Sequence, residues 1–328
     1  MPDSQFEAIK RHGVRVRKRR KDSSEQPEDV RWILDIAEKV RITGIGMEYF
    51  RKSVYNDNNK TARRAAEQAK NVRTPSTSMS SEQIVKFGNY EKLDTLMCNG
   101  MISNWVHNSG NTPAIVENLD GLKFIIPPKA TFHVGDAANV KQYCTINGIL
   151  FDLVIADPPW FCKSVKRQKT YEMNEEILDQ IDIPNITSDD ALIAVWITNR
   201  KGVKKEMENR FDKWCMELIS TWKWLKVTTE GEPVYGFDKQ RHKLPFESIV
   251  FAKKKTSKKE FKLPKSFTIS SIPMAVNSHK PPLLEVLQHF GIESKQPLEL
   301  FARSLLPSTH SIGFEPFLLQ SEHVYRRK

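Results

Sequence analysis

Apolar side chains recur at two different periods along this chain of 328 residues. Near the N-terminus the clearest period is helical, because the apolar residues between Val30 and Val40 are spaced as on one face of a helix. We therefore expect a helical region over residues 27–71. A tail over residues 1–26 precedes it, and a linker rich in Ser, Thr and Pro follows over residues 72–81.

From about residue 130 the pattern changes to short, continuous apolar runs. Thr131–Val134, Phe151–Ala156 and Ala191–Thr198 are typical of strands that are buried on both faces. Amphipathic stretches of helical period separate several of these runs. This alternation predicts an α/β domain over residues 82–328, with its core at about residues 130–328 and a mostly parallel sheet that helices cover on both faces.

The most informative motif directly follows one of these strands. The run that ends at Ala156 continues into Asp157-Pro158-Pro159-Trp160, and ligands of open α/β sheets lie beyond the carboxyl ends of strands. Two prolines fix the backbone and offer carbonyl acceptors without N–H donors. Such a corner suits adenine: Asp157 and a proline carbonyl can accept the two N–H groups of the N6 amine, and Trp160 can stack on the base. An ordinary turn after a strand is the alternative.

The balance of charged residues indicates what kind of partner the chain binds. There are 51 Lys and Arg residues against 40 Asp and Glu, a net charge of +11, which favours a phosphate polymer such as nucleic acid. Eight of the twelve residues over Lys10–Lys21 are Lys or Arg, and none is acidic. We expect this disordered basic tail to act as a nuclear import signal, with the cytoplasm left open as a second location. A nucleic-acid arm and a solvated tail are the alternatives.

Other features argue against some classes of protein. No apolar run approaches the roughly 20 residues of a membrane span, so no membrane contact is expected. The cysteines form no CxxC pair and none has ligand spacing with a histidine, so we expect free thiols and no metal site. They are Cys98, Cys144, Cys162 and Cys215.

Several segments, taken together and in order, resemble a known family. The chain is similar to the β-class N6-adenine methyltransferases of the MT-A70 family over about two thirds of its length, from Ser103 onward. The segments that carry the resemblance are FDLVIADPPW (151–160), KSVKR (163–167), AVWITNR (194–200), WKWLKVT (222–228), NSHKPPLLEVL (277–287) and LELFAR (298–303). The resemblance implies a Rossmann-like fold with permuted motif order, S-adenosyl-L-methionine as the cofactor, and a single chain that methylates adenine N6 in DNA or 2′-O-methyladenosine in small nuclear RNA.

The resemblance also implies roles for individual residues. Asp157 to Trp160 would hold the target amine. Asp136, Lys280 and Arg303 match positions that contact the cofactor, with Lys280 near its carboxylate and Arg303 at its ribose. Milder alternatives are a helix N-cap for Asp136 and a surface charge for Lys280.

The basic residues after the motif would meet phosphates that flank the target nucleotide, with a solvated loop as the alternative. They are Lys163, Lys166, Arg167 and Lys169. Tyr171 and Trp196 could line the pocket, although core packing explains Trp196 at least as well.

Two positions depart from the family pattern. The branch of the family that this chain resembles most usually has an asparagine at the position of Phe314, and that asparagine helps to hold the cofactor ribose. Leu306 stands where a polar residue is typical. Glu315 could reach the ribose instead. A nucleic-acid-binding protein with weak or absent catalysis is therefore the main alternative to an active enzyme, and methylation of cytosine or of protein glutamine is a further one.

Overall fold

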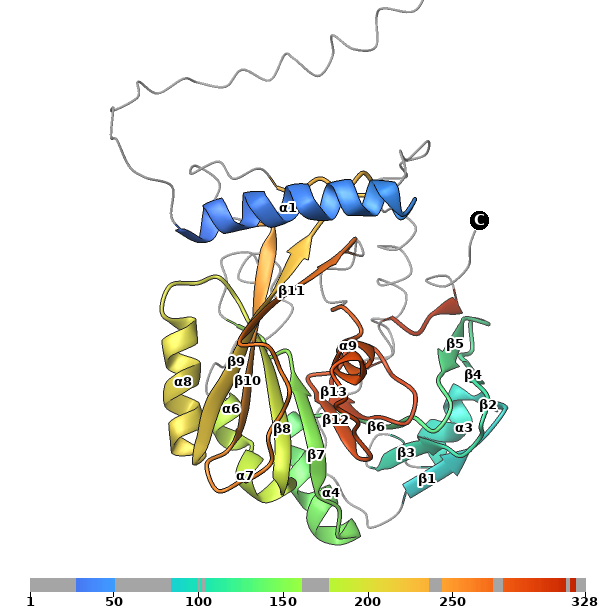
Figure 1. Ribbon diagram of the computed structural model, residues 1–328. Coiled ribbons are helices and arrows are strands. Elements are labelled where there is room, and N and C mark those ends of the chain that lie inside the picture. The colour runs from blue at the N-terminus through green and yellow to red at the C-terminus, as the bar shows by residue number, and fades with distance from the viewer. Residues whose placement is uncertain are drawn as a thin grey trace, which may run out of the picture.

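The computed structural model describes residues 28–50, 84–99, 101, 104–160, 177–235, 244–273, 280–316 and 319–322. Its main feature is one large sheet. The strands of this sheet are β1 (Ile84–Phe87), β3 (Trp105–Asn108), β6 (Thr131–Val134), β7 (Phe151–Ala156), β8 (Thr187–Ile197), β9 (Met216–Lys226), β10 (Phe246–Lys254), β11 (Ser266–Ser271), β12 (Pro297–Leu300) and β13 (His310–Gly313). They lie in the order β1-β3-β6-β13-β12-β7-β8-β10-β9-β11, which the reader can follow in Figure 1.

The centre of the sheet is parallel. Each neighbouring pair in the run β6-β13-β12-β7-β8 is parallel, so all five strands end at the same edge. Strand β10 is antiparallel to both β8 and β9, and it therefore begins at that edge. Strands β12 and β13 come late in the sequence but lie between β6 and β7. This arrangement is the permuted, Rossmann-like order that the sequence predicts.

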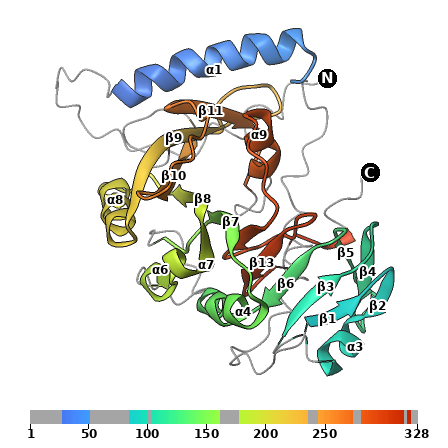
Figure 2. The ribbon, with the colours of Figure 1, turned by 60° about the horizontal axis from the view of Figure 1, so that its bottom comes forward.

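Alternate residues along the central strands face two different layers. Val154 and Ala156 of β7 belong to one buried cluster, whereas Leu153 and Ile155 belong to another on the opposite face. The first layer contains α4 (Val140–Asn147), α6 (Ile177–Gln180), α7 (Ile183–Ile186) and α8 (Val203–Lys213), and the second contains α9 (Leu283–His289). Figure 2 shows the two layers on opposite sides of the sheet.

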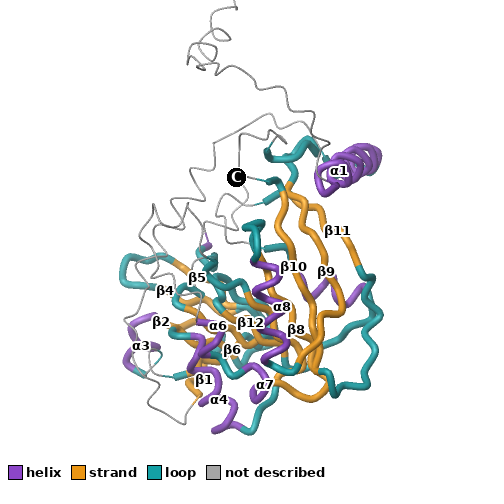
Figure 3. The backbone as a smooth tube through the Cα atoms, turned by 90° about the vertical axis from the view of Figure 1, so that its left-hand side faces the viewer, coloured by secondary structure: helices purple, strands orange, loops and turns teal. Residues whose placement is uncertain are grey.

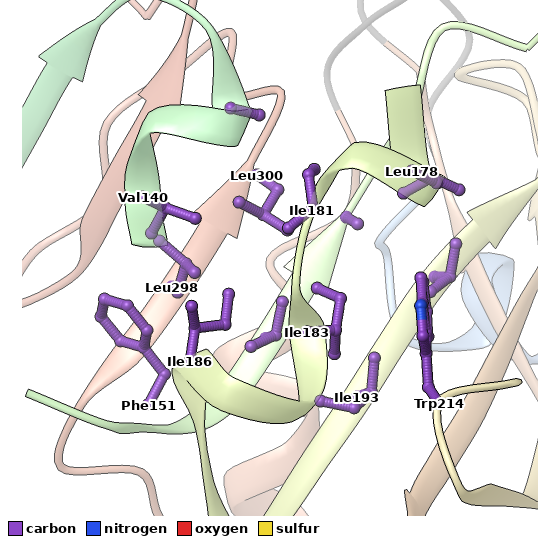
Figure 4. Packing of buried hydrophobic residues seen from close by; sticks show 14 of the residues in the cluster. Val140, Phe151, Leu178, Ile181, Ile183, Ile186, Ile193, Trp214, Leu298 and Leu300 are labelled. Atoms are coloured by element: carbon purple, nitrogen blue, oxygen red, sulfur yellow. The ribbon is translucent and has the colours of Figure 1, made fainter. Parts of the chain in front are cut away.

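The first layer forms a closely packed core. In Figure 4, Leu298 and Leu300 of β12 lie among Val140, Ile181 and Ile186, which belong to the helical side of this cluster. The parallel register of the two strands places Leu300 of β12 beside Ala156, the last residue of β7. As a result, the residues that follow these two strands start from fixed positions at the carboxyl edge.

The predicted N-terminal helix is α1 (Glu28–Gly46). Ile33 and Ala37 on one face of α1 belong to a buried cluster with Leu225 of β9 and Phe246 of β10. Figure 3 shows α1 across the end of β9 and β10. The helix is followed by a turn, in which Glu48 has a left-handed φ of 56°. The described part of the N-terminal region therefore packs directly on the sheet.

Residues 84–126, in which apolar residues follow no clear period, form several short elements. A smaller sheet in the order β2-β4-β5 is built from β2 (Tyr90–Lys92), β4 (Ala114–Glu117) and β5 (Lys123–Ile126), and helix α3 (Leu93–Cys98) follows β2. Strands β1 and β3 from the same stretch extend the large sheet beyond β6. Among the described residues, the large sheet thus begins at Ile84.

Several predictions concern segments outside the described residues. These are the tail over 1–26, the part of the helical region over 51–71, the linker over 72–81, Cys162, the basic run over 163–169 and Tyr171. Within the described ranges, no helix combines the length and apolar character that a bilayer crossing needs. In the same ranges, no three His, Cys, Asp or Glu side chains gather as they would around a metal ion.

Candidate active site

The Asp-Pro-Pro-Trp motif forms a tight turn at the carboxyl end of β7. The carbonyl oxygen of Pro158 accepts a hydrogen bond from the Trp160 N–H at 2.8 Å, which closes a three-residue turn around Pro159. A carbonyl oxygen has two lone pairs, so Pro158 keeps one acceptor position. The turn is stiff, as expected from its prolines, and it directly follows Asp157.

Trp160 anchors this turn to the neighbouring strand. Its indole Nε1–H donates to the backbone oxygen of Trp196 in β8 at 2.6 Å, and the residue is only 5% exposed. Stacking on adenine stays a prediction. Trp196 itself is 1% exposed, so its core role is confirmed.

Two cations hold one oxygen of the Asp157 carboxylate. Lys280 Nζ lies 3.2 Å from Asp157 Oδ2, and a guanidinium nitrogen of Arg303 donates to the same oxygen at 3.3 Å. Lys280 precedes α9 and Arg303 follows β12, so three separate parts of the chain meet here. Within the described ranges, no group forms a hydrogen bond with Oδ1, which leaves this oxygen as an acceptor for an N–H donor.

Lys280 also belongs to a second set of charges. Its Nζ lies 2.5 Å from Glu247 Oε2 at the start of β10, and Lys226 at the end of β9 donates to the other oxygen of Glu247. The rings of Trp196 and Trp224 lie below the Lys280 ammonium, with their centroids 5.6 Å and 5.9 Å from Nζ. A buried ammonium thus has two acids and two indole faces around it.

The pKa values in this cluster reflect its charges. Burial alone would lower the pKa of Lys280, but the charges of Asp157 and Glu247 outweigh burial and raise it. Burial alone would raise the pKa of Glu247, and here the charges of Lys280 and Lys226 outweigh it and lower the pKa. Both groups are therefore charged at neutral pH.

Glu299, within β12, is a polar residue of the site that sequence reasoning missed. Burial, with the charge of Asp157 as a second cause, raises its pKa to about 8, although Arg303 acts in the opposite direction. Its carboxyl group is therefore neutral at pH 7 and can both donate and accept hydrogen bonds. Its Oε2 is buried and has no hydrogen-bond partner among the described residues. A ligand hydroxyl group would satisfy such an atom.

The other predicted cofactor residues lie along the same edge. Asp136 follows β6, and its Oδ1 accepts a hydrogen bond from Ala138 N at 2.9 Å, so the N-cap alternative is confirmed. Glu315 follows β13 and is buried. Phe314 and Leu306 are half-buried, so one part of this edge is apolar. Lys163, Lys166, Arg167 and Lys169 lie outside the described residues.

Two further residues missed at the sequence level are Lys226 and Glu247. Lys226 and Glu299 stand inside the segments WKWLKVT and LELFAR, and a charged residue within a buried strand was the available signal. Glu247 stands in FESIV at the start of β10. It gave the same signal, but its partners come from β9 and from the segment before α9, so the sequence could not show which charges it contacts.

The fold and the turn at β7 define a Rossmann-like methyltransferase. The sequence model described as MT-A70 matches residues 151–315, half of the chain, and the chain belongs to the MT-A70 family. Members of this family are generally S-adenosylmethionine-dependent methyltransferases.

Three individual proteins show which members of the family this chain is similar to. The chain is 60% identical over 328 residues to a Caenorhabditis elegans protein named DNA N6-methyl methyltransferase, and the match covers 100% of this chain and 89% of the relative. It is 33% identical over 229 residues to human N(6)-adenine-specific methyltransferase METTL4, and 35% identical over 221 residues to the mouse protein. These matches cover 66% and 63% of this chain, and only 47% and 45% of the METTL4 proteins. The motifs quoted above predict that the chain resembles methyltransferase-like protein four (METTL4) within this family, and these matches confirm it.

Proposed function

We propose that this chain transfers a methyl group from S-adenosyl-L-methionine to the N6 nitrogen of adenine in nucleic acid. The observation that carries the proposal is the state of Asp157. Two cations hold its Oδ2, and its Oδ1 has no hydrogen-bond partner in the described part of the chain. The stiff Pro158–Pro159 turn lies directly beside it.

The residues at the carboxyl edge fit the proposed cofactor. The buried, unpartnered Oε2 of Glu299 can bond a ribose hydroxyl, and the charge of Arg303 acts on the same carboxyl group. Lys280 has three N–H donors, of which Asp157 and Glu247 engage two, so one is left for a carboxylate. When bound, the cofactor supplies an electrophilic methyl group on a sulfonium centre.

The protein's contribution to the chemistry is alignment. The N6 amine is a poor nucleophile, since its lone pair is delocalised into the purine ring. Asp157 Oδ1 accepts one N–H, and the free lone pair of the Pro158 carbonyl accepts the other. The nitrogen would then become pyramidal, with its lone pair toward the methyl group of a bound cofactor. As the C–N bond formed, the bond between sulfur and the methyl group would break to leave a neutral thioether, and N6 would lose a proton to Asp157 or solvent. Alignment of this kind can supply about 7–11 kcal/mol.

The proposal extends to the kind of nucleic acid that serves as the substrate. The C. elegans relative is named for DNA, whereas fungal relatives that are 29% and 31% identical are named N6-methyladenosine RNA methyltransferases. A duplex would need its adenine flipped out at a cost of a few kcal/mol, so a single strand is the less costly substrate. We propose that the basic run over 163–169 binds the flanking phosphates and that the tail over 1–26 directs the protein to the nucleus.

One observation favours a second candidate function. Phe314 and Leu306 place half-buried apolar side chains at the cofactor edge, where neither can form hydrogen bonds to a ribose. A protein with this edge could keep the fold and bind nucleic acid with weak or no catalysis. The experiment below separates the two functions.

The test combines cofactor binding with methyl transfer. Calorimetry measures binding of S-adenosyl-L-methionine, and labelled methyl transfer is then measured on matched single-stranded DNA, RNA and 2′-O-methyladenosine RNA. We expect the wild type to be active, and Asp157→Asn to lose at least about a hundredfold in rate with the fold intact. Asp189→Asn, an exposed acid paired with Lys254 at the opposite edge, is the control and should stay active. Cofactor binding without transfer to any polymer would support the inactive alternative.

A further inference from the structure

Glu247 carries a carboxylate whose two oxygens each contact a different lysine. It is the second residue of β10, which begins at the edge where β8 and β9 end. Its Oε1 accepts a hydrogen bond from Lys226, and its Oε2 lies 2.5 Å from Lys280 Nζ. Because both oxygens are engaged, the carboxylate cannot rotate without the loss of one ion pair.

Lys280 lies between two acids at unequal distances. Its Nζ is 2.5 Å from Glu247 Oε2 and 3.2 Å from Asp157 Oδ2. The attraction between opposite charges grows as their distance falls, so Glu247 is the stronger anchor. The lysine stem is flexible, and residues 280–282 belong to no helix or strand. The position of the ammonium is therefore set by the acids that bind it.

We propose that Glu247 is a positioning residue, which restrains the Lys280 ammonium from closer contact with Asp157 and so keeps the Asp157 carboxylate open to the target amine. The inference rests on the proposed function, because it concerns the same acceptor. Without Glu247, Lys280 would move onto Asp157, the other acid that it contacts among the described residues. Its N–H donors would then compete with those of adenine.

The backbone around Glu247 is built to hold this position. Phe246 and Leu225 are register partners in the β9–β10 pair, and both lie in the buried cluster under α1. Glu247 and Lys226 are their immediate neighbours in the chain. The charges of Lys280 and Lys226 lower the pKa of Glu247, so the anchor stays ionised at neutral pH. The packing of Phe246 and Leu225 thus fixes the positions of β10 and β9, and these strands place Glu247 and Lys226 at the carboxyl edge.

The test replaces Glu247 in two ways. Glu247→Gln keeps the shape of the side chain but has a single acceptor oxygen, and Glu247→Met removes both acceptors. We expect the kcat for methyl transfer to fall by about tenfold to a hundredfold, while the KM for the oligonucleotide changes by less than about twofold. Glu247→Asp keeps the charge and should recover part of the rate. The matched control is Glu217→Gln in β9, whose partner is Lys253 at 3.5 Å and which lies at the opposite edge.

A second measurement does not depend on activity. In a crystal structure of Glu247→Met, we expect Lys280 Nζ to have moved toward Asp157, closer than in the wild type. An ammonium that keeps its wild-type place in this variant, or an unchanged kcat in an active enzyme, would overturn the positioning role. A wild type that transfers no methyl group would instead refute the proposed function, and the place of Lys280 would still decide the role of Glu247.

Discussion

At the scale of single residues, Gly313 controls how the last strand enters the site. A Cβ atom at this position would lie 2.7 Å from the backbone oxygen of Ala302 and 2.8 Å from its nitrogen. Both atoms belong to the main chain between β12 and Arg303, so they cannot move aside as a flexible side chain would. Only glycine allows β13 to approach this segment so closely, and Phe314 and Glu315 follow immediately.

We therefore predict that Gly313→Ala lowers stability by about 1–3 kcal/mol and weakens cofactor binding. The added methyl group forces β13 away from Ala302 and displaces Glu315 with it. Chemical denaturation and calorimetry measure the two effects. Gly46→Ala at the end of α1 is the control, because no atom lies within 4 Å of the added Cβ; it should change stability by less than about 0.5 kcal/mol. Equal losses in the two variants would contradict this reading of Gly313.

At the scale of elements, the sequence predicted best where an element could be recognised from its own residues. The continuous apolar runs predicted β6, β7 and β8, and helical periodicity predicted α1. Strand β13 reads HSIG and contains only one large apolar residue, so its burial between β6 and β12 could not be seen locally. The strands over 84–126 have three or four residues each, which is too short for a periodic pattern.

The same reasoning separates the site residues that were found from those that were missed. Asp157 could be predicted because it directly follows a strand that is plain in the sequence. Glu247 and Lys226 come together only because β10 inserts antiparallel between β8 and β9. No local pattern encodes that insertion. The contact of Arg303 with Asp157 likewise depends on the position of β12 beside β7, and the contact of Lys280 depends on the position of the segment before α9.

Helix α1 provides the prediction at this scale. Ile33 is fully buried against Leu225 and Phe246, whereas the next residue, Leu34, is 43% exposed. We predict that Ile33→Ala costs about 2–5 kcal/mol of stability and also slows methyl transfer, because Leu225 and Phe246 hold the strands that carry Lys226 and Glu247. Leu34→Ala, on the same helix, should change both by little. Melting curves and transfer rates provide the measurement, and similar effects of the two variants would argue against a supporting role for α1.

At the scale of the whole molecule, the carboxyl edge collects charges while the interior of the sheet holds neutral histidines. His310 of β13 and His133 of β6 lie in one aromatic group with Trp105. Burial lowers the pKa of His310 to about 4, and it lowers the pKa of His133 as well. Both imidazoles are neutral in the folded protein at pH values where the unfolded chain already binds protons.

The resulting pH dependence has a definite sign. Between the unfolded pKa of 6.5 and the folded pKa of about 4, the unfolded state binds more protons at His310, so the free energy of unfolding falls as the pH falls through this window. The full contribution of His310 is at most about 3 kcal/mol. Glu299 acts in the opposite direction, because its raised pKa of about 8 means that the folded state retains a proton that the unfolded chain loses above pH 4.5.

We predict that denaturant unfolding at a series of pH values from 8 to 4 separates these two groups. His310→Gln should lose less stability than the wild type as the pH falls from about 6.5 to 4, since it has no imidazole to protonate. Glu299→Gln should lack the loss of stability that the wild type shows as the pH rises from about 4.5 to 8. Both variants keep polar side chains of similar size, so the shape of the pH profile is a better readout than stability at one pH. Profiles parallel to that of the wild type would mean that these buried groups do not set the pH response of the fold.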